Sequence, residues 1–189
     1  GEMARVDTSF GNETYKIRLT GTSHNAWDSL TQEYFNIKAV YVYNGDTLVS
    51  LTNPASSGYI NNRTADGVYV AGESLTDTVN GGEFWSSPKG TEGTEWWEAS
   101  FTGPITKCRV HFYYSSNHVY FDIFNIEILD SAGNRIINLG EQGGSNNAVE
   151  SNGNWRDTGD IDITNMIQYS KYKSNYLFYG PAANYNPYP

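Results

Sequence analysis

Apolar and polar residues alternate with a period of two along several short segments of this chain, and glycine, asparagine and serine interrupt the segments. Lys107 to Tyr113 shows the cleanest alternation, and Tyr15 to Leu19 shows the same pattern. Successive side chains of a β-strand point to opposite faces of a sheet, so this period predicts half-buried strands. Such closely spaced strands, without convincing amphipathic helices, predict an all-β fold, an antiparallel jelly-roll β-sandwich.

Turn residues divide the chain into strands and two hairpins. The expected strands are residues 15–19, 37–43, 47–51, 96–101, 107–113, 120–129 and 135–139. Asn44-Gly45-Asp46 is a strong two-residue hairpin signal, and Ser131 to Asn134 predicts the second hairpin. Residues 53–88 are rich in Asn, Gly, Ser and Thr, which predicts long loops and short strands.

The alternation in residues 107–113 also assigns each side chain to a face. Cys108, Val110 and Phe112 are predicted to point inward, which makes Cys108 a buried, inert thiol. Lys107, Arg109 and His111 are predicted to point outward, with His111 on a solvated face. Trp85 and Trp96 are expected in the core.

The length of 189 residues predicts one domain with extensions. We expect an N-terminal extension over residues 1–12, whose Gly1-Glu2-Met3 start is typical of a cloning remnant, and a β-sandwich over 13–140. Residues 141–175 are expected to add strands or a loop extension. Residues 176–189 form a tail rich in Tyr, Asn and Pro that could be an ordered arm, a linker or an oligomer contact.

Composition and charge exclude several classes of function. A formal net charge of −9 argues against nucleic acid as a partner, because nucleic-acid binders need a basic surface. The single cysteine excludes an intramolecular disulfide and a cysteine cluster for zinc. No apolar run approaches the roughly 18 residues needed to span a bilayer, so no membrane span is expected.

Several segments, taken in order, resemble the F5/8 type C (discoidin-like, galactose-binding-like) family. The resemblance covers about two thirds of the chain and stops near Gly140. The segments that carry it are Tyr15 to Gly21, Asn25 to Leu30, Ile37 to Asn44, Ala65-Asp66-Gly67, Phe84 to Ser87, Trp96 to Phe101, Ile105 to Tyr113 and Phe124 to Asn134.

This resemblance implies a galactose-binding-domain-like jelly roll whose loops at one end bind a ligand, usually a sugar. It also implies a structural Ca²⁺ near the turn at Asp66, with Glu98 as a further ligand. Arg63 and Val68 stand where the related lectins often have Asn, which weakens that site. The fucose-binding pattern of the family is absent, since Tyr113-Tyr114-Ser115-Ser116 occupies the expected region.

Three loop clusters combine aromatic rings with planar polar groups, the combination that a sugar site needs. Each cluster has a structural alternative, in which Trp27 fills the core and the asparagines only form turns. The candidate ligand-binding residues are His24, Asn25, Trp27, Asn62, Arg63, Asn117, His118 and Tyr120.

Catalysis finds little support in the sequence. The chain has no nucleophile elbow, no His-Glu-x-x-His motif and no phosphate-binding glycine loop. Glu95 and Glu98 could supply a glycosidase pair, but strand residues three apart point to opposite faces. Asp157, Asp160 and Asp162 could serve the same chemistry or hold calcium, although such a cluster is more often a solvated turn.

The sequence therefore predicts a non-catalytic carbohydrate-binding module that recognises cell-surface or polysaccharide glycans. We expect it to be extracellular, cell-surface or virion-associated, as part of a secreted bacterial or phage tail protein. The alternative is a structural assembly module that forms homo-oligomers or contacts other domains of a parent protein.

Overall fold

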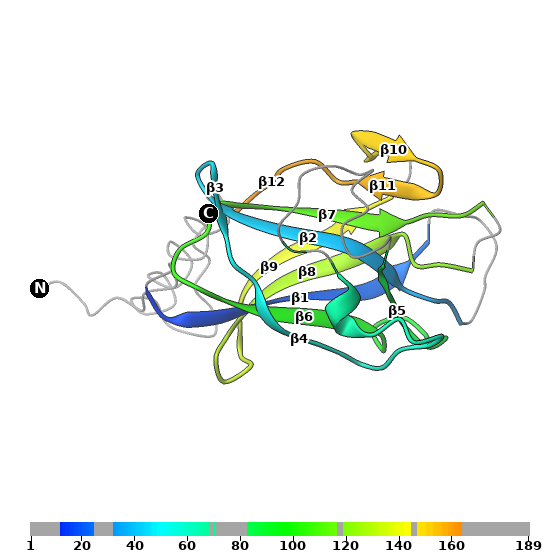
Figure 1. The fold of residues 1–189 in the computed structure, drawn as a ribbon, viewed down its shortest axis with the longest axis horizontal. Coiled ribbons are helices and arrows are strands. Elements are labelled where there is room, and N and C mark those ends of the chain that lie inside the picture. The colour runs from blue at the N-terminus through cyan, green and yellow to red at the C-terminus, as the bar shows by residue number, and fades with distance from the viewer. Residues whose placement is uncertain are drawn as a thin grey trace, which may run out of the picture.

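The computed structural model describes residues 12–24, 32–68, 70, 83–116, 119–144 and 147–163. These residues form two antiparallel sheets packed face to face, so the fold is an all-β sandwich (Figure 1). The first sheet has the strand order β4-β6-β1-β8-β9. Its members are β1 (Thr14–Ser23), β4 (Thr52–Ser56), β6 (Trp96–Thr102), β8 (Ile123–Asp130) and β9 (Arg135–Gly143).

The second sheet has the order β10-β11-β7-β2-β3, with β5 also paired to β2 and β12 also paired to β7. The chain crosses repeatedly between the sheets. The members of the second sheet are β2 (Asn36–Asn44), β3 (Thr47–Val49), β5 (Trp85–Ser86), β7 (Lys107–Tyr113), β10 (Glu150–Asn152), β11 (Trp155–Asp157) and β12 (Ile161–Asp162), and a 3₁₀ turn, η1 (Ala65–Gly67), precedes β5.

Alternation builds the core as the sequence predicts. Tyr15, Ile17 and Leu19 of β1 are all buried, while the residues between them are half-buried. Across the sandwich, β7 buries Cys108 and Val110 against them. The two inner faces form a continuous apolar cluster, which supplies most of the stabilisation expected from burial.

Both predicted hairpins are confirmed. Asn44 pairs with Thr47 across the two-residue turn between β2 and β3, and Gly45 adopts the positive φ of 62° that such turns favour. The second hairpin joins β8 to β9, where the Asp130 carboxylate accepts hydrogen bonds from the backbone N–H groups of Ala132 and Asn134. β9 runs past the predicted end at Leu139 to Gly143.

Three expectations about exposure are wrong. Trp96 is half-exposed, with the Arg18 guanidinium 4.4 Å above its ring, because β6 points Trp97 rather than Trp96 into the core. His111 and Asp157 were expected on solvated surfaces, yet both are fully buried. They are paired residues of neighbouring strands β7 and β11, so each covers the other.

Candidate functional site

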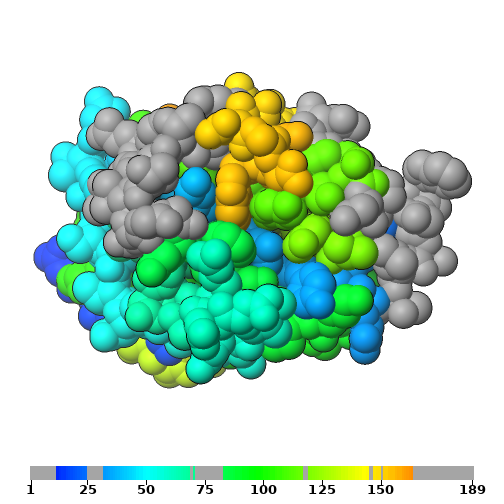
Figure 2. Space-filling view, turned by 45° about the vertical axis from the view of Figure 1, so that its right-hand side comes forward, coloured from blue at the N-terminus to red at the C-terminus, as the bar shows by residue number. Residues whose placement is uncertain are grey.

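A cleft of about 360 Å³ lies at the end of the sandwich where β2 begins and β7 ends. We call it the aromatic cleft, and it is lined by Tyr34, Asn36, Ile60, Asn61, Arg63, Phe84, Ser86 and Tyr120. An adjoining hollow of about 350 Å³ shares three of these residues and adds Asp66 and Glu83. Figure 2 shows the segments that carry these residues together on one face of the molecule.

Paired strands fix the floor of the aromatic cleft. Asn36 is the first residue of β2 and lies opposite Ser86 of β5. The Ser86 hydroxyl donates a 2.7 Å hydrogen bond to Asn36 Oδ1, and both residues are buried. Because Oδ1 already accepts this bond, the amide N–H groups of Asn36 are the ones left to donate to a ligand.

One wall of the cleft is a tight loop that hydrogen bonds hold to β5. Asn61 and Asn62 have φ angles of 51° and 58°, in the left-handed region that asparagine tolerates better than most residues. Backbone hydrogen bonds join Ile60 N to Ser86 O at 3.0 Å and Ser86 N to Arg63 O at 3.2 Å. The loop therefore presents Arg63 from a fixed position.

Five aromatic rings form a continuous row beside and within the cleft. Ring centroids are 5.1 Å apart for Phe84 and Trp155, 5.1 Å for Trp155 and Tyr113, and 4.5 Å for Tyr113 and Tyr120. Tyr34 completes the row, 5.9 Å from Tyr120. We call Phe84, Trp155, Tyr113, Tyr120 and Tyr34 the aromatic row. All five side chains are only half-buried, so part of each remains accessible.

Cations lie over the rings of this row. Arg63 Cζ lies 4.1 Å from the centroid of Phe84, and Lys89 Nζ lies 5.5 Å from that of Tyr34. Lys38 Nζ lies 5.3 Å from the centroid of Trp155. Cation–π contacts of this kind hold long basic side chains against rings without neutralising their charge.

The hydroxyl of Tyr120 remains a hydrogen-bond donor well into the alkaline range. Burial raises the pKa of Tyr120, and the neighbouring phenols of Tyr113 and Tyr34 raise it further. A protonated phenol can both donate to and accept from a sugar hydroxyl, which suits the site to neutral polyols.

The structure brings three of the sequence candidates to this end of the molecule. Arg63 and Tyr120 line the aromatic cleft, and Asn62 lines the adjoining hollow. Asn25, Trp27, Asn117 and His118 lie outside the described residues. His24 does not line the cleft. Its ring nitrogen Nδ1 is paired instead with the buried carboxylate of Glu33.

Sequence reasoning missed most of the aromatic row. Tyr34, Tyr113 and Trp155 come from three segments that are far apart in the sequence. Phe84 was assigned only to a family motif. The available signal was the number of aromatic residues near the ends of the predicted strands. No periodicity relates these positions to one another.

The two expected calcium ligands differ in their surroundings. Asp66 is exposed in the adjoining hollow, where the Thr64 hydroxyl donates a 2.6 Å hydrogen bond and lowers the pKa of its carboxyl. Glu98 is buried on β6, 2.6 Å from Arg18 Nη2 and 3.4 Å from Lys16 Nζ. Two cations already balance the charge of Glu98, so it is poorly suited to Ca²⁺.

No group of three His, Cys, Asp or Glu side chains arranged to hold a metal occurs in the described part of the chain. Calcium near Asp66 stays a prediction of the family resemblance. Backbone carbonyls of the loop around it would have to supply most of the oxygen ligands that Ca²⁺ requires.

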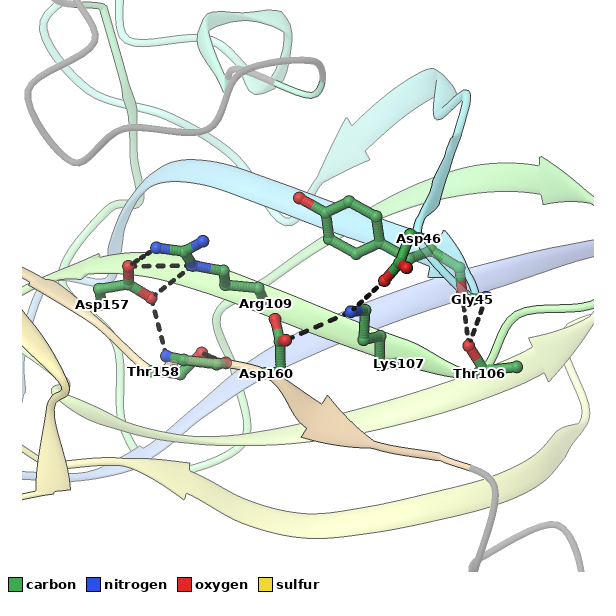
Figure 3. A network of polar contacts seen from close by, with 10 residues as sticks. Gly45, Asp46, Thr106, Lys107, Arg109, Asp157, Thr158 and Asp160 are labelled. Atoms are coloured by element: carbon green, nitrogen blue, oxygen red, sulfur yellow. Dashed lines mark hydrogen bonds and ion pairs between the residues drawn. The ribbon is translucent and has the colours of Figure 1, made fainter.

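A second polar cluster lies on the outer face of β7, beside β11 and β12 (Figure 3). Arg109 Nε lies 2.9 Å from both carboxylate oxygens of Asp157, and Arg109 Nη2 also donates to Oδ2. His111 Nε2 lies 3.3 Å from the same Oδ2. The backbone N–H of Gly159 donates to Oδ1 at 2.7 Å. We call Arg109, His111 and Asp157 the Asp157 cluster.

These contacts set the charge of Asp157. Burial, the largest single influence, would raise its pKa, but hydrogen bonds from Arg109, His111 and Gly159 outweigh it and hold the pKa well below its usual range. The same pairing raises the pKa of Arg109. Arg109 and Asp157 therefore form a structural ion pair that ties β11 to β7.

Cys108 takes no part in either site. It is fully buried, and burial raises the pKa of its thiol to about 12. A thiol with this pKa carries almost no thiolate near neutral pH, so the predicted inert cysteine agrees with the structure.

None of the described segments forms a helix that is long and apolar enough to cross a membrane. Comparison of the chain with protein-family models, with curated proteins and with solved structures found no match.

Proposed function

We propose that this chain is a non-catalytic glycan-binding module and that the aromatic cleft holds the sugar. One observation carries the proposal: a row of half-exposed rings borders a cleft whose floor and wall present planar polar side chains. Such a module suits a secreted, cell-surface or virion-associated parent protein, in keeping with the discoidin-like resemblance of the sequence.

The chemistry of the cleft matches that of a pyranose ring. The C–H groups on one face of a sugar pack against aromatic faces, which Tyr34 and Tyr120 supply. The hydroxyl groups around the ring need donors and acceptors held in place, which Asn36 and Asn61 supply. Tyr34 and Tyr120 are joined by an isolated β-bridge, Asn36 begins β2, and Asn61 lies in a hydrogen-bonded loop, so little ordering is needed on binding.

The carboxylates near the cleft support a binding role over glycoside hydrolysis. Hydrolysis needs one carboxyl group with a raised pKa as general acid. Asp66 has a lowered pKa, which makes it a poor acid. Glu95 has a pKa raised by burial but does not line the cleft.

A glycan-array screen of the purified chain tests the proposal, followed by titration of the best ligand against Tyr120→Ala and Phe84→Ala. We expect each substitution to weaken binding by about 5-fold to 150-fold, because stacking partners of this kind contribute roughly 1 to 3 kcal/mol. Tyr59→Ala is the matched control, since Tyr59 is 54% exposed and does not line the cleft.

Circular dichroism of each variant must show a folded sandwich before its affinity is compared. Equal affinity for wild type and both cleft variants would reject the cleft as the site. A blank array combined with a stable multimer in solution would instead favour the assembly module.

A further inference from the structure

The lysines and arginines of the described residues fall into two groups with different surroundings. One group forms ion pairs with carboxylates and consists of Lys16, Arg18, Lys107, Arg109 and Arg135. The other group lies over aromatic rings near the cleft and consists of Lys38, Arg63, Lys89 and Arg156. Arg18 and Lys107 of the first group also lie over rings, those of Trp96 and Tyr43. Five described cations are thus paired with carboxylates, and the cations near the cleft lie over rings.

Arg63 lines the aromatic cleft, and Lys89 lies beside one of its lining residues, Tyr34. The Arg63 guanidinium lies 4.1 Å from the centroid of Phe84, and the Lys89 ammonium lies 5.5 Å from that of Tyr34. Neither of the two forms an ion pair with any described carboxylate. In a chain with a net charge of −9, two uncompensated cations at one cleft need an explanation.

Resting on the function proposed above, we infer that the preferred ligand is an acidic saccharide, whose anionic group binds Arg63 in the cleft while Lys89, beside Tyr34, adds to the positive charge. A guanidinium presents two parallel N–H donors that match the paired oxygens of a carboxylate or a sulfate. The ammonium of Lys89 adds a second positive charge without imposing a geometry. The aromatic rings then hold the apolar face of the same sugar.

The placement of the acidic side chains of this chain orients the ligand. Asp66 and Glu83 line only the adjoining hollow. An anionic group there would be repelled, so it must lie toward Tyr34, Ser86 and Tyr120. The neutral remainder of the saccharide extends toward the hollow, where Asn62 and Thr64 offer hydrogen bonds.

The test compares probes that differ only in charge. Isothermal titration uses an oligomer of glucuronic acid, its carboxyl-reduced counterpart built of glucose, and a sulfated glucose oligomer, each at two salt concentrations. We expect an acidic oligomer to bind at least tenfold more tightly than the neutral one, with the preference reduced by salt. A preference for the sulfated oligomer over the glucuronate identifies sulfate as the anionic group.

Variants separate charge recognition from sugar binding. Arg63→Gln and Lys89→Gln should remove most of the preference for the acidic oligomer, weakening its binding more than that of the neutral oligomer. Arg135→Gln is the matched control, because Arg135 is exposed on β9 and pairs with Glu127. Tyr120→Ala should weaken binding of both oligomers alike.

The outcomes distinguish the two proposals. Binding that depends on Tyr120 but shows no preference for charge overturns the acidic-saccharide inference and leaves glycan binding intact. A charge preference that persists in Arg63→Gln and Lys89→Gln also overturns the inference. Absence of binding to every oligomer here and to every glycan on the array rejects the proposed function itself.

Discussion

Charged side chains have different partners in the Asp157 cluster and in the aromatic cleft, although both regions lie on the second sheet. At the cluster, a fully buried carboxylate is matched by Arg109, His111 and a backbone N–H. At the cleft, Arg63 and Lys89 rest on rings without a described carboxylate partner. Paired charges hold strands together, whereas the cations that rest on rings are available to a ligand.

Strand β11 connects the two regions. Trp155 at its start belongs to the aromatic row, and Asp157 at its end anchors the cluster. Tyr113 and His111 are their partners on β7. The cluster therefore fixes the strand that carries one ring of the row. Substitutions in the cluster and substitutions in the cleft can each test the comparison between the two regions.

The largest effect is expected from Asp157→Asn. It removes the negative charge that balances Arg109 and leaves the cluster with an uncompensated cation, at a cost of about 3 to 5 kcal/mol in the free energy of unfolding. Urea denaturation measures this cost. Asp160→Asn is the control, because the Asp160 side chain is 55% exposed and its pairing with Lys107 is solvated. A loss of stability in Asp157→Asn no larger than the small loss expected in Asp160→Asn would show that the cluster is not structurally important.

Lowering the pH should reduce the stabilisation that the Asp157 cluster contributes. The pKa of Asp157 is lower in the folded chain than in the unfolded chain, so its stabilisation is present above the unfolded value of about 3.9 and is lost as the pH falls below it. Denaturation of wild type and Asp157→Asn at several pH values between about 3 and 6 checks this prediction. The difference in stability should shrink toward the acid end, and a constant difference would contradict it.

A matched pair of arginine substitutions compares the regions directly. Arg109→Gln should cost about 2 kcal/mol of stability, because it leaves the buried Asp157 carboxylate short of a partner. Arg63→Gln should cost less than about 1 kcal/mol, the value of a partly exposed cation–π contact. Denaturation midpoints measure both. Equal losses would mean that Arg63 is structural and would remove it from the ligand site.

The strands were predictable because burial repeats every second residue. The alternation from Lys107 to Tyr113 also assigns His111 correctly to the outer face of β7. It cannot reveal that Asp157 pairs with His111, because pairing depends on strand register between distant segments. This is why a buried histidine was predicted to be solvated.

The cleft was predictable only in part for the same reason. Arg63 and Tyr120 stand out as a cation and a ring next to turn residues. Tyr34 meets Tyr120 through an isolated parallel bridge, and Trp155 meets Phe84 across two distant segments. Contacts of this kind follow from topology, which the local pattern of a single sequence does not encode.

The smallest expected effect comes from Glu83→Gln and has the opposite sign. Glu83 is an exposed carboxylate in the hollow that adjoins the cleft, so removing its charge should leave the denaturation midpoint unchanged. It should tighten binding of an acidic saccharide slightly, by roughly twofold, because it reduces repulsion near the uncompensated cations. Titration at low salt measures this gain. Glu127→Gln on β8 is the control, since Glu127 pairs with Arg135 outside the cleft. An equal gain in both variants would trace the effect to net charge alone, whereas a gain confined to Glu83→Gln would place the anionic group of the ligand within reach of the cleft cations.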